Sequence, residues 1–104
     1  MGTGRLATLD ITSAATDTLF YTIPSNKTSS FSMCFTNRTS DNALVRIAFT
    51  TTSSITADEY VAYDVALYPN EIYERNGFIL VAGQYVYVRS SITGVTVVAW
   101  GYES

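Results

Sequence analysis

Apolar and polar residues alternate with a period of two along most of this chain, and no helical periodicity interrupts the alternation. Residues 29–35 illustrate it, because Phe31, Met33 and Phe35 share one face and smaller residues share the other. Such alternation is typical of strands that bury one face of a sheet. The other strands are expected near residues 6–11, 17–23, 43–49, 59–67, 71–75, 78–82, 84–91 and 94–102. The pattern therefore predicts eight or nine strands.

Connections between these segments are short, and none contains the long helix that a parallel crossover needs. Antiparallel pairing follows. We predict an all-β fold, a single antiparallel β-sandwich of the Ig-like or jelly-roll Greek key type, over residues 1–104, with a short N-terminal arm at about residues 1–8. The expected core residues are Phe31, Met33, Phe35, Val45, Ile47, Phe49, Leu80, Val86, Val88, Val97 and Ala99.

One stretch, residues 76–91, allows more than one interpretation. Asn76-Gly77 is a strong hairpin signal, and it is equally consistent with a bulge inside one long strand. Residues 78–81 are apolar without alternation, which predicts burial on both faces or a strand that crosses between sheets. Gly83 can adopt a positive φ angle, so Ala82-Gly83 predicts a sharp reversal.

Charge and composition exclude several classes of function. Net charge is −3 and the six basic residues are scattered, so no basic surface favours nucleic-acid binding. The longest wholly apolar run, residues 78–82, is far shorter than the ~20 residues of a membrane-spanning helix. With only 14% charged residues, the chain is expected to fold into a core rather than remain disordered.

Catalytic and metal-binding chemistry has few candidate residues. The chain contains no histidine and one cysteine, Cys34, which we expect to be a buried, inert thiol. Serine–histidine and zinc sites are therefore excluded. The acids Glu71 and Glu74 are three apart in a strand and should point to opposite faces. We predict no enzymatic activity, no metal and no cofactor, and we interpret the glycosylation-type sequences at Asn26 and Asn37 as turns.

Aromatic residues suggest where the protein meets a partner. Tyr85, Tyr87 and Arg89 share one strand face, and Tyr and Arg are enriched at protein interfaces. The eight tyrosines and Trp100 could instead stack on sugars, although packing across pleated strands explains most single aromatic residues. Arg5 and Leu6 in the N-terminal segment complete the candidate interface, because this segment could reach a neighbour.

Residues 17–103 resemble small β-sandwich virion structural proteins of tailed bacteriophages. The resemblance lies in turns and strands: a strand ending in "YTIP", then "TNR", "VRIA", and a block "LYPNEIYERNGFILVAGQYVYVRSS" before a terminal "GVTVVAWGYE". The matching positions are Tyr21, Ile23, Pro24, Asn37, Arg38, Val45, Arg46, Ile47, Ala48, Leu67, Glu71, Glu74, Arg75, Asn76, Gly77, Leu80, Gly83, Val88, Ser90, Ser91, Gly94, Val95, Gly101 and Glu103. Ile23 replaces the usual valine, and "PSNK" replaces a Pro-Ala-Gly-type turn.

The resemblance implies a structural role in a virion. Its leading version is a capsid decoration or cement protein, a homotrimer that binds the major capsid protein and stabilises the assembled head. The alternative is a tail or fibre module, such as an adaptor, a knob or a glycan-binding receptor tip. No nucleic-acid or membrane partner is expected, and the protein would lie on the outer surface of the capsid or on the tail.

Overall fold

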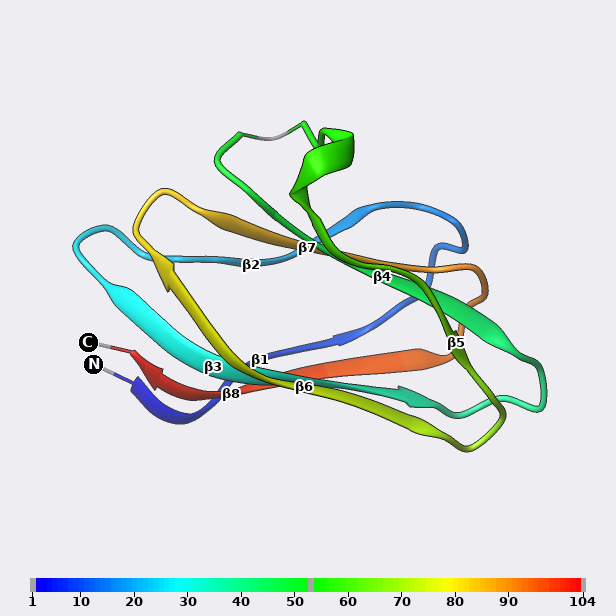
Figure 1. Cartoon of the computed structure of the whole chain (residues 1–104). Coiled ribbons are helices and arrows are strands. Elements are labelled where there is room, and N and C mark those ends of the chain that lie inside the picture. The colour runs from blue at the N-terminus through cyan, green and yellow to red at the C-terminus, as the bar shows by residue number, and fades with distance from the viewer. Residues whose placement is uncertain (1, 53, 104) are drawn as a thin grey trace.

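The computed structural model describes residues 2–52 and 54–103, which form eight strands and one short 3₁₀ turn, η1 (Ala57–Glu59). Two antiparallel four-stranded sheets face each other (Figure 1). Sheet I has the order β1-β8-β3-β6 and sheet II the order β2-β7-β4-β5. The strands are β1 (Gly2–Asp10), β2 (Thr18–Thr22), β3 (Thr28–Asn37), β4 (Ala43–Thr50), β5 (Tyr60–Leu67), β6 (Ile72–Val81), β7 (Tyr85–Ser90) and β8 (Val95–Glu103).

Strand pairing is nested from the chain ends inward. β1 pairs with β8, β2 with β7, β3 with β6 and β4 with β5, while β3–β8 and β4–β7 join these pairs into the two sheets. This is the arrangement of an eight-stranded jelly roll. The predicted antiparallel sandwich is thus confirmed. Of the two predicted topologies, Ig-like and jelly-roll, the structure has the jelly-roll order.

The core lies between the inner faces of the two sheets, where period-two alternation places the large apolar side chains. Ten of the eleven predicted core residues are buried. The exception is Phe49, which is only partly buried and packs against the core. Its ring lies 6.2 Å from the ring of Phe31 and 4.9 Å from that of Phe78 in edge-on contacts, so it belongs to an aromatic cluster beside the core.

The four edge strands β1, β2, β5 and β6 all carry register shifts, whereas the central pairs β3–β8 and β4–β7 have none within the described residues. Bulges disrupt the open row of backbone donors and acceptors that an edge offers to other strands. In β6 the shift lies at Asn76 and Gly77, which together face Ser32. Asn76-Gly77 is therefore a bulge within one strand, not a hairpin, and Gly77 adopts a φ of +83° there.

Of two expectations about β6 and its surroundings, one differs from the structure and one agrees with it. The predicted burial of residues 78–81 on both faces is wrong: Leu80 is 6% exposed, but Ile79 and Val81 are 67% and 52% exposed. The reason is that β6 is an edge strand of sheet I with one face to the core and the other to solvent. The predicted reversal at Ala82-Gly83 is present, between β6 and β7.

The N-terminal segment also differs from expectation. Instead of a free arm over residues 1–8, the described residues form β1, which pairs with β8 as far as Asp10. Leu6 lies at the β1 bulge and packs partly buried against the core. Leu6 therefore packs against the core of the sandwich, and its predicted contact with a neighbour stays a prediction.

A buried asparagine fixes the end of the sandwich where β3 ends. The Asn37 amide nitrogen donates to the carbonyl oxygens of Asp41 at 2.8 Å and Leu67 at 3.0 Å, and Asn37 itself is 0% exposed. Its Oδ1 atom accepts from the backbone nitrogen of Thr39 at 3.0 Å and from the Thr39 hydroxyl at 2.7 Å. Asn37 is thus the last residue of β3 rather than a turn residue, and its fully engaged side chain joins the β3–β4 turn to the end of β5.

Candidate functional site

The outer face of sheet II gathers tyrosine and arginine side chains from three adjacent strands. β7 contributes three half-buried residues that alternate with its buried residues. β4 and β5 place further residues of the same types beside them. We call this surface the Tyr–Arg face; it consists of Arg46, Tyr60, Tyr63, Tyr85, Tyr87 and Arg89.

The centre of the Tyr–Arg face is built by the bulge in β5. Val45 pairs with Val65 and Ile47 with Ala62, so Arg46 faces both Tyr63 and Asp64. Asp64 adopts a positive φ of 51°, which turns its carboxylate onto the guanidinium. Arg46 Nε donates to Asp64 Oδ1 at 2.6 Å and Nη2 donates to Oδ2 at 3.2 Å.

Aromatic rings cover the same guanidinium. The Arg46 Cζ atom lies 3.9 Å from the centre of the Tyr63 ring and 5.7 Å from that of Tyr60. The two rings meet edge-on with centres 5.0 Å apart. Hydrogen bonds from Arg46 hold the pKa of Asp64 below its usual value, so the pair stays ionised at neutral pH. The planar guanidinium is therefore held in one orientation by its bidentate partner and by the stacked ring.

A second acidic residue, Asp17, contacts the Tyr–Arg face at Arg89 and Tyr60. Arg89 Nη1 lies 3.8 Å from Asp17 Oδ2, and the Tyr60 hydroxyl donates to the same carboxylate oxygen at 3.4 Å. Asp17 precedes β2, so these contacts link the segment before β2 to β7 and β5. The result is a partly desolvated surface of aromatic rings and paired charges, suited to non-covalent contact with another protein.

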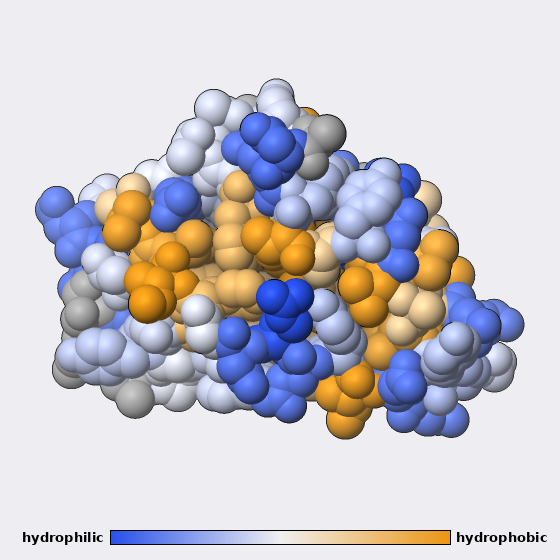
Figure 2. All heavy atoms as spheres, in the orientation of Figure 1, coloured by the Kyte–Doolittle hydropathy of each residue, from blue (hydrophilic) through white to orange (hydrophobic). Residues whose placement is uncertain are grey.

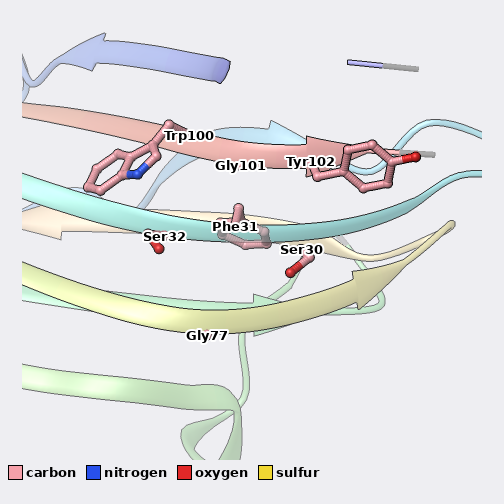
Figure 3. Close-up of a pocket in the computed structure, with 7 residues that line it drawn as sticks. All are labelled: Ser30, Phe31, Ser32, Gly77, Trp100, Gly101 and Tyr102. Atoms are coloured by element: carbon pink, nitrogen blue, oxygen red, sulfur yellow. The ribbon is translucent and has the colours of Figure 1, made fainter. Parts of the chain in front are cut away.

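The outer face of sheet I carries a different feature, an open depression of about 360 Å³. It crosses β8, β3 and β6 and is lined by Ser30, Phe31, Ser32, Gly77, Trp100, Gly101 and Tyr102. Figure 3 shows Trp100 and Tyr102 extending to either side of Gly101, with Ser32 and Ser30 beside them on β3. Phe31 turns its side chain into the core, so it contributes backbone to the floor.

A polar cluster connects the two sheets near the end of β8. The Ser29 hydroxyl, from a fully buried residue, donates to Glu103 Oε2 at 2.6 Å, and the Tyr21 hydroxyl of β2 donates to the same oxygen. Burial, and then the hydrogen bond and charge of Glu103, raise the pKa of Tyr21 to about 12. Burial raises the pKa of Glu103, but the hydrogen bonds from Ser29 and Tyr21 and the charge of Lys27 outweigh this and leave it lowered.

The candidate interface residues predicted from sequence fall on two separate surfaces. Tyr85, Tyr87 and Arg89 do share the outer face of sheet II. Arg5 is exposed on β1, opposite Trp100 in sheet I, and so lies apart from them. Sequence reasoning did not connect Arg46 with its partners Tyr63 and Asp64, although alternation already placed Arg46 opposite the core-facing residues.

The remaining candidate residues for catalysis or metal binding lie in separate places. Glu71 Oε1 accepts from the backbone nitrogen of Tyr68 at 3.0 Å in the turn before β6. Cys34 is half-buried on the outer face of sheet I rather than in the core, and burial raises the pKa of its thiol. Over residues 2–52 and 54–103, no three acidic, cysteine or histidine side chains are grouped as metal ligands would be. In the same residues, no helix is long and apolar enough to span a bilayer.

Comparison with known proteins assigns no family or function to the chain. No protein-family model, no curated protein and no solved structure matches the chain significantly.

Proposed function

We propose that this protein is a structural component of a tailed-phage virion that decorates or cements the capsid, and that the Tyr–Arg face is its contact with the capsid lattice. The Tyr–Arg face carries this proposal. It combines the residue types that dominate binding energy at protein interfaces, and its guanidinium groups are already oriented by Asp64 and Asp17. A preoriented surface loses less side-chain entropy when it binds.

Contact through a sheet face, rather than a sheet edge, agrees with the positions of the bulges. All four edge strands carry register shifts, which makes continuous strand addition at an edge unfavourable. The resemblance of residues 17–103 to small virion proteins and the frequent use of jelly rolls in viral capsids support the same role.

The trimer belongs to this proposal too, with self-association on the β5–β6 side of the sandwich. Figure 2 shows apolar residues in a band on the side where these two edge strands face the viewer. Exposed apolar residues of the two strands that lie outside the Tyr–Arg face include Val61, Ile72, Ile79 and Val81. Exposed apolar surface of this kind favours association between subunits.

Stabilisation of the head would follow from mass action. A protein that binds the assembled, expanded lattice but not free capsid subunits shifts the equilibrium toward the lattice. No reaction centre is needed for this, and broad non-covalent contact is sufficient. The major capsid protein is the expected partner.

An add-back experiment tests the proposal. Heads assembled without this protein should lose heat resistance and regain it when the purified protein is added. The double variant Tyr63→Ala/Arg89→Ala should bind heads much more weakly, because it removes an exposed ring and a paired cation from the Tyr–Arg face. Tyr68→Ala is the matched control, since Tyr68 is 54% exposed in the turn after β5 and lies outside that face. Equal heat resistance with and without the protein would contradict the cement role.

The alternative is a tail or fibre module, and location distinguishes it. A tail module would copurify with tails in few copies, whereas a decoration protein would cover the head.

A further inference from the structure

The depression on the outer face of sheet I has the features of a small ligand site, and it lies on the opposite sheet from the Tyr–Arg face. Two rows of side chains border it. Trp100 pairs with Ser32 in one row, and Tyr102 pairs with Ser30 in the other. Between the rows, Gly101 pairs with Phe31, whose side chain points to the core. The two aromatic residues are two positions apart on one strand, so their Cα atoms are roughly 7 Å apart.

Two glycines keep the depression open. A Cβ atom on Gly101 would lie 2.1 Å from the carbonyl oxygen of Ser30 and 2.7 Å from the Cα of Phe31, so no larger residue fits against β3 here. Gly77 lines the β6 side of the depression at the bulge, where no side chain closes it. The floor is thus backbone and the walls are aromatic rings and hydroxyl groups.

The polar groups of the lining are available to a ligand. Within the described residues, no hydrogen bond joins the hydroxyls of Ser30 and Ser32 or the indole N–H of Trp100 to another part of the protein. Each serine hydroxyl can both donate and accept, whereas the indole N–H only donates. None of the lining residues is charged. An uncharged lining of this kind favours a neutral ligand over a phosphate, a carboxylate or a nucleic acid, which require cations.

We propose that this depression binds a neutral saccharide. A sugar ring presents an apolar C–H face, which can stack on Trp100 or Tyr102, and a rim of hydroxyl groups, which can exchange hydrogen bonds with Ser30 and Ser32. A proline-rich peptide also docks on aromatic grooves, but it presents mainly carbonyl acceptors and would use the serine hydroxyls only as donors. The paired hydroxyls therefore favour the sugar. The inference is independent of the capsid proposal.

The direct test uses the fluorescence of Trp100, which is the sole tryptophan of the chain and lines the depression. The purified protein is titrated with lactose, maltose, N,N′-diacetylchitobiose and a fucosylated trisaccharide. We expect a saturable change in emission with at least one of them, with a dissociation constant on the order of 1 mM, because the site is open and the contact small.

Variants localise the binding. Tyr102→Ala removes a ring that is 46% exposed, and Ser32→Leu fills the depression, so each should weaken binding by about tenfold or more. Tyr68→Ala, outside the depression, should leave the affinity unchanged. Circular dichroism confirms that each variant is folded. Heads should still bind Tyr102→Ala, so failure of the sugar site and failure of the capsid proposal are distinguishable.

Three results would overturn the sugar proposal. One is the absence of a saturable signal with all four saccharides. A second is a signal that Ser32→Leu leaves intact, because the sugar would then bind elsewhere. The third is binding of a decaproline peptide, blocked by Ser32→Leu, without binding of any saccharide, which would make the depression a peptide site.

Discussion

Replacing Asn37 with alanine should destabilise the protein more than almost any other polar substitution. Asn37 is 0% exposed, and its side chain takes part in four hydrogen bonds: two donated to the carbonyls of Asp41 and Leu67, and two accepted from Thr39. Alanine removes all four at once. The Leu67 carbonyl then remains in a buried site without this donor, because Leu67 is only 1% exposed.

The expected cost follows from these contacts. Each hydrogen bond contributes about 1 kcal/mol net, and the loss at Leu67 is larger than at the exposed Asp41 carbonyl, which water can reach. We expect a loss of about 3–4 kcal/mol in the free energy of unfolding. A domain of this length has a total of roughly 5–15 kcal/mol, so the variant loses a large part of its stability. The corresponding fall in Tm is about 12–30 °C.

Urea unfolding followed by circular dichroism measures this loss. The midpoint should fall while the slope m stays unchanged, since the surface exposed on unfolding is nearly the same. Asn42→Ala is the matched control, because Asn42 is an exposed asparagine in the same turn, and it should change stability by less than about 0.5 kcal/mol. If Asn37→Ala loses less than about 1 kcal/mol, the claim that Asn37 fixes this end of the sandwich is wrong.

Three further predictions concern the sheets and the Tyr–Arg face. Gly101→Ala should cost about 3 kcal/mol or more in a urea titration, because its Cβ would meet the Ser30 oxygen at 2.1 Å, whereas Gly83→Ala, with open space around it, should cost only about 1–2 kcal/mol of backbone strain. The raised pKa of Tyr21 means that the folded state holds the Tyr21 proton more tightly than the unfolded state does. The stabilisation of the folded protein by the protonated Tyr21 is therefore complete below about pH 10 and is lost as the pH rises toward about 12. Tyr21→Phe should remove this part of the pH dependence of Tm. Arg46→Lys should weaken binding to heads in a cosedimentation assay while the protein stays folded, since lysine cannot keep both the bidentate contact and the stacked ring; unchanged binding would remove Arg46 from the contact.

Much of the fold could be predicted from sequence because each strand has one face toward the core. Period-two alternation therefore identifies both the strands and the inward residues, as for Phe31, Met33 and Phe35. The exposed outer face of residues 78–81 could not be predicted from the sequence, for a physical reason. An apolar run in an edge strand looks like a doubly buried strand, and only strand order reveals that Ile79 faces solvent.

The candidate sites were predictable only in part, because they depend on pairing between distant segments. Alternation places Tyr85, Tyr87 and Arg89 on one face without further information. The contact of Arg46 with Asp64 requires the bulge in β5 and a positive φ, which no local pattern indicates. The sheet I depression likewise depends on register.

The register of three strands creates that depression. Gly101 of β8 lies opposite Phe31 of β3, and the β6 bulge places Gly77 near Ser32. In the sequence, Trp100-Gly101-Tyr102 is an ordinary part of an aromatic strand. It forms the wall of a site only because the strand register places Ser30 and Ser32 of β3 beside it.

The number of copies of this protein per virion tests the central claim most directly. Quantitative mass spectrometry of purified particles, together with separated heads and tails, measures it relative to the major capsid protein. The decoration account predicts hundreds of copies, all in the head fraction. A small number of copies that separates with the tails would contradict it and favour the tail-module alternative.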